Sequence, residues 1–261
     1  RLLAAATFAL ALAGCAAPPA DAPAIEHRTR GAGTPVVVFQ SGLGDGEAVW
    51  RGVQDELAGR VASVAFSRSG YGSSPLRAGG RSPCEVAQST RDFLRAAGIA
   101  PPYVLVGHSL GGLYQYAYAQ RYPDEVAALV LLDPTHPQHW SALQREAPAL
   151  AAVVKAARAT AFSAAMRREF DDQAQCAGEL EARRFPAVPV KLLVRERFTG
   201  LEVGAYERLA HRLEADWAAR LGGVEVTRVA GTGHYLQRDR PRAVGVAIIA
   251  AVVAARAARS Q

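Results

Sequence analysis

Short apolar runs alternate with longer amphipathic segments along most of the chain. Runs rich in Val, Leu and Ala over residues 35–40, 61–66, 103–106, 126–132, 188–194 and 224–229 predict strands buried on both faces. Between them, apolar residues three or four positions apart predict helices over residues 48–58, 84–97, 113–121, 201–221 and 242–258. Strands that alternate with helices at this spacing are typical of βαβ units. We therefore expect an α/β fold built on a mostly parallel sheet.

The segment over residues 135–186 interrupts this alternation. It is rich in Ala and Arg, follows a helical pattern and contains no strand-like run. Its length suits a helical cap inserted over the carboxyl-terminal edge of the sheet. We therefore expect a core made of residues 31–134 and 187–261, with residues 135–186 as the cap.

The amino-terminal stretch predicts a targeting signal. Arg1 precedes a short apolar run that ends at Ala13, and a Pro/Ala-rich stretch follows. Leu12-Ala13-Gly14-Cys15 resembles the lipobox of bacterial lipoproteins, which implies a signal peptide over residues 1–14, lipidation of Cys15 and a tether over residues 15–30. Because Ala16 rather than Asp follows the cysteine, the resemblance implies the periplasmic face of the outer membrane rather than the inner membrane. The alternative is an ordinary secretory signal with an incidental cysteine.

Composition narrows the class of partner. Half of the 261 residues are hydrophobic and the net charge is +6, which fits one globular α/β domain. The arginines are scattered rather than clustered and no nucleic-acid motif accompanies them, so we expect no nucleic-acid partner. Oligomeric state is left open. Cys84 and Cys176 are either a disulfide, as an exported protein permits, or two separate buried thiols.

The candidate chemistry centres on Gly107-His108-Ser109-Leu110-Gly111. An apolar strand precedes this stretch and a helical pattern follows it, which is the context that a nucleophile elbow requires. The two glycines allow a tight turn, and Ser109 at its apex is expected to adopt a strained backbone conformation. Ser109 is therefore the candidate nucleophile.

Four motifs occur in the order seen in α/β-hydrolases. They are Gly42-Leu43-Gly44, Arg68-Ser69-Gly70-Tyr71-Gly72-Ser73, the Ser109 elbow and Gly233-His234. The resemblance covers about residues 33–257 and implies a Ser-His-acid hydrolase with a sheet of about eight strands. A serine at the elbow, where epoxide hydrolases and haloalkane dehalogenases carry a nucleophilic Asp, argues against those two activities. His234, in a loop between the last strand and the last helix, is the expected general base.

Two carboxylates are candidates for the acid of the triad. Many α/β-hydrolases carry it after the strand that corresponds to residues 188–194, where Phe198 occupies the usual Asp position and Glu196 lies nearby. Others carry it one strand earlier, and Asp133, 24 residues after Ser109, resembles the arrangement in haloalkane dehalogenases with a strand-six acid. We favour Asp133, because Arg195 and Arg197 flank Glu196 and would compete for its charge.

The resemblance also implies an oxyanion hole made of the backbone N–H groups of Leu43 and Leu110. We expect no metal, since His136 and His139 have no third ligand near them in sequence, and no cofactor. The expected function is hydrolysis of small carboxylic esters through an acyl-enzyme. The alternatives are an amidase, peptidase or acyltransferase with the same triad, and a binding protein that has lost catalysis.

Overall fold

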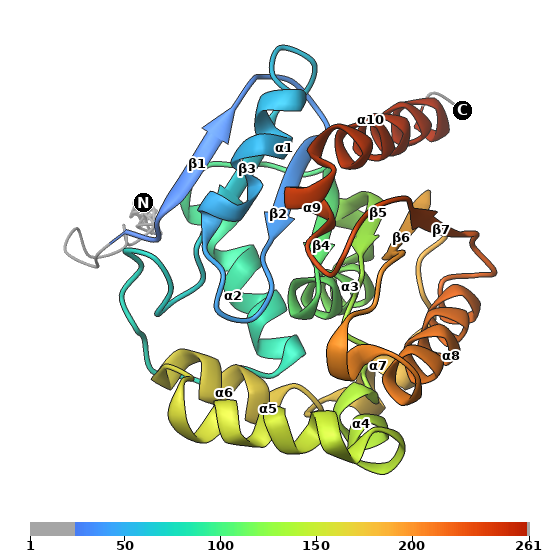
Figure 1. Cartoon of the computed structure of the whole chain (residues 1–261). Coiled ribbons are helices and arrows are strands. Elements are labelled where there is room, and N and C mark those ends of the chain that lie inside the picture. The colour runs from blue at the N-terminus through green and yellow to red at the C-terminus, as the bar shows by residue number, and fades with distance from the viewer. Residues whose placement is uncertain (1–23, 260–261) are drawn as a thin grey trace, which may run out of the picture.

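A seven-stranded sheet forms the centre of the computed structural model, which describes residues 24–259 (Figure 1). The strands lie in the order β1-β3-β2-β4-β5-β6-β7, and all neighbours are parallel except β1 and β3. Their bounds are β1 His27–Arg30, β2 Val36–Gln40, β3 Ser63–Phe66, β4 Tyr103–His108, β5 Val126–Leu132, β6 Val190–Arg195 and β7 Val226–Val229. The expected α/β-hydrolase fold is confirmed, with seven strands in the described residues rather than about eight.

Helices cover both faces of the sheet. Apolar side chains of α2, α3 and α8 share one buried cluster with the strands, and those of α1 and α10 share a second. The bounds are α1 Arg51–Glu56, α2 Pro83–Ala96, α3 Leu110–Arg121, α8 Ala205–Arg220, α9 Leu236–Asp239 and α10 Pro241–Ala258, with short 3-10 helices at Glu47–Trp50, Pro123–Glu125 and Gly200–Glu202. The predicted helices over 48–58 and 201–221 each begin with one of these 3-10 turns.

Helix α10 is long and apolar enough to cross a membrane by length and composition alone. In the fold it packs on the sheet, with Val244, Ile248 and Val252 buried in the same cluster as β2 and β5. Core packing therefore explains the apolar residues of its buried face, whereas Val246 and Val253 of the same helix are exposed.

Four helices lie between β5 and β6, where the sequence predicts the cap. They are α4 His139–Glu146, α5 Pro148–Thr160, α6 Ala164–Asp172 and α7 Ala177–Ala182, and Figure 1 shows α4, α5 and α6 together at one end of the sheet. A disulfide between Cys84 on α2 and Cys176, which precedes α7, joins this region to the core.

The tether was expected to include residues 15–30, but the last four of these residues belong to the sheet. Residues His27–Arg30 form β1, which pairs antiparallel with β3, and the main chain of Glu26 accepts a hydrogen bond from Ser67 N at 2.9 Å. The sequence His-Arg-Thr-Arg has no apolar alternation because this edge strand is mostly exposed, so its pattern gives no strand signal. The signal peptide and Cys15 lie outside the described residues.

Candidate active site

Ser109 occupies the sharp turn between β4 and α3. Its backbone has φ 52° and ψ −124°, a sparsely populated conformation for a residue with a side chain. A Cβ on Gly107 would meet the carbonyl oxygen of Gly111 at 2.5 Å, and one on Gly111 would meet that of Gln40 at 2.2 Å. The turn is thus possible only with glycine at both positions. It holds the Ser109 hydroxyl 3.4 Å from Oγ1 of Thr135.

Asp133 and His234 meet beside this turn. Asp133 directly follows β5 and also has a positive φ, 45°, while His234 lies in the loop between β7 and α9. Oδ2 of Asp133 lies 2.6 Å from Nδ1 of His234. Nε2 of His108 contacts the main-chain oxygen of His234 at 2.8 Å and so supports the loop. Burial alone would raise the pKa of Asp133, but hydrogen bonds and charges from His234 and Arg195 hold it well below its ordinary value.

Glu196, the alternative acid, does not contact the imidazole. Its Oε2 accepts a 2.7 Å hydrogen bond from the backbone N–H of Gly231, and the side chain is exposed. The carboxylate therefore braces the loop that carries His234. The structure brings Asp133, and not Glu196, to the nitrogen that a triad acid contacts.

Arg195 contacts both Asp133 and His234, although its place in the sequence led us to expect only that it would compete for the charge of Glu196. This buried guanidinium contacts Oδ2 of Asp133 through Nε at 2.7 Å and Oε1 of Glu202 through Nη1 at 2.6 Å. Its Nη2 lies 2.7 Å from Nδ1 of His234. The available sequence signal was its place at the carboxyl end of a buried strand neighbouring the strand that precedes Asp133.

One imidazole nitrogen therefore faces both a carboxylate and a guanidinium. Nδ1 of His234 donates to Asp133 when it carries the proton, and accepts from Arg195 when it does not. A triad requires the first of these states, because the opposite nitrogen must be free to take the proton of the nucleophile. Asp133, with its negative charge preserved by its surroundings, favours that state.

The residues of both expected oxyanion donors lie close to Ser109. Leu110 is the first residue of α3, so its N–H has no carbonyl partner within the helix. Leu43 follows Gly42, where a Cβ would meet Cβ of Ser109 at 3.3 Å. The N–H of Leu43 donates no hydrogen bond within the described part of the chain. Both donors are thus available near the nucleophile.

A cavity of about 260 Å³ lies between the catalytic candidates and the cap helices α4 and α5. Ser109, Asp133 and His234 line it, and its apolar wall comes from β6, α4, α5 and α8 through Leu143, Leu150, Val154, Leu192, Val194, Leu213 and Trp217. Within the described residues, no group of three or more His, Cys, Asp or Glu side chains could hold a metal ion. The site thus combines a polar end that carries the catalytic candidates with an apolar wall.

The two cap histidines, His136 and His139, also line this cavity. Nε2 of His136 contacts Oδ2 of Asp216 at 2.6 Å, and its Nδ1 accepts from Gln138 N. Burial, together with the nearby His234 and His136, lowers the pKa of His139 to about 4. Burial also lowers the pKa of His136 despite the contact with Asp216. Both rings are therefore neutral at physiological pH.

Known proteins resemble this chain in sequence and in structure. The chain is 31% identical over 112 residues to the uncharacterized protein YbdG of Bacillus subtilis, which covers 42% of this chain and 34% of the relative. It is 36% identical over 105 residues to the human (lyso)-N-acylphosphatidylethanolamine lipase, and the aligned region covers 39% of this chain and 30% of that lipase. The chain thus spans about a third of the length of these curated relatives.

A thermophilic esterase from Thermogutta terrifontis has a similar fold, with a TM-score of 0.63 and 18% identity over 87% of this chain and 92% of that chain. Residues 35–197 match the family model described as the alpha/beta hydrolase fold. That segment contains the elbow, the loop of Leu43, the strand that precedes Asp133 and the whole cap. Fold, elbow geometry and family match agree, and the chain belongs to the α/β-hydrolase family.

Proposed function

We propose that the protein is a serine hydrolase that cleaves carboxylic esters through an acyl-enzyme. The observation that carries the proposal is the Asp133–His234 contact beside the strained Ser109, with all three side chains on one cavity. The elbow and the apolar wall support an acyl substrate. Among the relatives and neighbours, a human lipase and a bacterial esterase have names that fit this chemistry.

The proposed reaction uses only groups of this chain and water. Oγ of Ser109 attacks the ester carbonyl while Nε2 of His234 takes its proton, and Asp133 stabilises the imidazolium. The N–H groups of Leu43 and Leu110 stabilise the oxyanion of the tetrahedral intermediate. The intermediate collapses, the C–O bond breaks, and His234 returns the proton to the leaving alcohol. Water, deprotonated by His234, then attacks the acyl-enzyme and releases the acid and free Ser109.

We propose export and lipid anchoring through Cys15 as the setting for this activity. The lipobox-like Leu12-Ala13-Gly14-Cys15 motivates this, and the disulfide between Cys84 and Cys176 fits an oxidising compartment. Several acyl chains, as in bacterial lipoproteins, give firm anchoring where one gives only marginal binding.

A fluorophosphonate probe and a set of p-nitrophenyl esters of increasing acyl length test the proposal. We expect phosphonylation of Ser109, found by peptide mass spectrometry, and turnover of at least the shorter esters. Ser109→Ala, with an unchanged melting curve, should lose both, with turnover lower by roughly 10⁴-fold or more. A folded wild type that neither reacts nor hydrolyses any ester would support the binding-protein alternative. Faster cleavage of matched anilides would support an amidase.

A further inference from the structure

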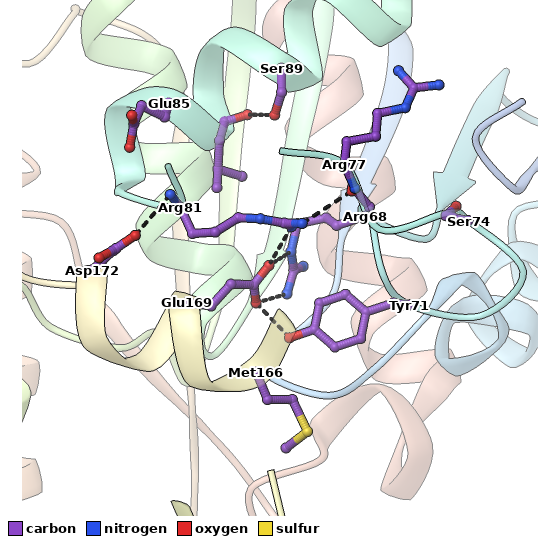
Figure 2. Close-up of polar contacts among 12 residues, drawn as sticks. Arg68, Tyr71, Ser74, Arg77, Arg81, Glu85, Ser89, Met166, Glu169 and Asp172 are labelled. Carbon is purple, nitrogen blue, oxygen red and sulfur yellow. Dashed lines mark hydrogen bonds and ion pairs between the residues drawn. The ribbon is translucent and has the colours of Figure 1, made fainter. Parts of the chain in front are cut away.

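A carboxylate of the cap is buried against the core, away from the catalytic candidates. Glu169 lies on α6 and is completely buried. Its two oxygens accept hydrogen bonds from Nε and Nη2 of Arg68, both at 2.8 Å, and from the hydroxyl of Tyr71 at 2.8 Å. Arg81 lies 3.6 Å away on the same carboxylate (Figure 2). Because a buried carboxylate is costly unless it is paired, this contact fixes where α6 rests on the core.

The same guanidinium contacts the loop that precedes Leu43. Nη1 of Arg68 donates to the main-chain oxygen of Ser41 at 2.6 Å, and Nη2 donates to that of Gly42 at 3.0 Å. Arg68 thus joins two successive carbonyl groups of this loop to the cap carboxylate. Its guanidinium also lies 5.0 Å and 5.1 Å from the ring centres of Tyr71 and Tyr114, which restrict its movement.

The hydrogen bond to Gly42 constrains the expected oxyanion donor directly. The carbonyl of Gly42 and the N–H of Leu43 belong to one planar peptide group, in which they point in opposite directions. When Arg68 holds the carbonyl, the direction of the N–H is fixed as well. Gly42 adjoins Cβ of Ser109, so this peptide group lies beside the nucleophile.

We infer that Arg68 is the positioning residue of the oxyanion hole and that Glu169 holds it in place, so that the seating of the cap sets the direction of the Leu43 N–H. This inference rests on the proposed ester hydrolysis. Preorganised donors stabilise a developing oxyanion because they need no reorientation during the reaction. Loss of the Arg68–Glu169 contact should therefore weaken binding of the transition state more than binding of the substrate.

The test compares Arg68→Lys and Glu169→Gln with a matched control, Arg81→Met. Arg81 is buried and contacts Glu169, but it makes no hydrogen bond to Ser41 or Gly42. Each variant is checked for a cooperative melting transition. The measurements are kcat and KM with a p-nitrophenyl ester, and the inhibition constant of a trifluoromethyl ketone, which forms a tetrahedral oxyanion adduct with Ser109.

Arg68→Lys and Glu169→Gln should lower kcat by about 10²-fold with little change in KM, in line with the loss of one oxyanion donor. The ketone inhibition constant should rise by a similar factor, while Arg81→Met lowers the melting temperature and leaves both values unchanged. Unchanged kcat and ketone affinity in folded Glu169→Gln, or equal losses in Arg81→Met, would overturn the inference. If Arg68→Lys does not fold, the kcat and the ketone inhibition constant of Glu169→Gln test the inference on their own. A wild type inert to fluorophosphonate and esters would instead overturn the proposed function, and this inference with it.

Discussion

The guanidinium of Arg195 lies 2.7 Å from Nδ1 of His234, on the same side of the imidazole as the carboxylate of Asp133. A positively charged guanidinium therefore lies next to Asp133 and His234. In a serine hydrolase, the corresponding Asp–His pair stabilises the positive charge of the imidazolium. Asp133 and Glu202 offset the charge of the guanidinium, each through a short contact with Arg195. The arrangement is stable only as a group, because each member compensates the charge of another.

Arg195→Met should lower the free energy of unfolding by about 3–5 kcal/mol, because it leaves the largely buried Asp133 without the guanidinium that compensates its charge. Arg197→Met is the matched control, since Arg197 is exposed two residues further along, and it should change stability by less than about 0.5 kcal/mol. Urea denaturation of the three proteins measures both. Equal stability of the two variants would show that the Arg195 contacts contribute nothing net.

Asp133→Asn should lower ester turnover by about 10⁴-fold while the protein remains folded, because an amide cannot hold the required imidazole tautomer or stabilise its charge. Glu196→Gln should cost much less, since the Glu196 carboxylate, within the described residues, accepts its hydrogen bond from the loop N–H of Gly231 and not from the imidazole. Steady-state kinetics on both variants, with native melting curves, give the ranking. The opposite ranking would move the triad acid to Glu196.

Stability should fall as pH decreases from about 6.5 towards 4. Burial lowers the pKa of His139 to about 4 and also lowers those of His108 and His136. Between these values and the ordinary pKa near 6.5, the unfolded chain binds protons that the folded chain does not, so protonation favours unfolding. This contribution is fully present above about pH 6.5 and is lost as the pH falls through the folded pKa.

Chemical denaturation at several pH values between 4 and 7 measures this dependence. His139→Gln should flatten this dependence, because it removes the group whose pKa falls to about 4. A stability that is constant over this interval in the wild type would contradict the expectation.

Cys15→Ser should release the protein from the membrane fraction of bacteria that express it. The reason is that lipid chains on Cys15 would supply the anchoring, as the resemblance to a lipobox implies. Cell fractionation, with mass spectrometry of the mature amino terminus, measures it. A wild type that is soluble and carries no lipid would end the anchoring proposal.

Sequence patterns predicted those strands whose residues are all buried. Strands such as Val126–Leu132 are continuous apolar runs with all residues buried, and the elbow of Ser109 carries its own glycines. Ser109 and His234 came from motif order, which reflects topology, and Asp133 came from its position at the end of the strand that follows the Ser109 helix. Their distances could not be predicted, because 101 residues separate Asp133 from His234.

Other features left no local signal. Strand β1 is polar, so only its pairing with β3 identifies it. The Arg68–Glu169 pair spans 101 residues of chain, and the sequence does not indicate which of many arginines faces a given glutamate. Arg195 was visible as a residue at a strand end, but its partners depend on the neighbouring strand and on the 3-10 helix of Glu202.

The polar sequence of β1 also bears on strand addition between copies of this protein. An open sheet presents unpaired N–H and C=O groups at its outermost strands, and these can recruit a foreign strand. Here both outermost strands, β1 and β7, have four residues, and arginines such as Arg28 and Arg228 occupy them. Short, charged margins discourage strand addition. The same polar residues that give β1 no strand-like sequence pattern thus also disfavour aggregation of the folded protein through the edge of its sheet.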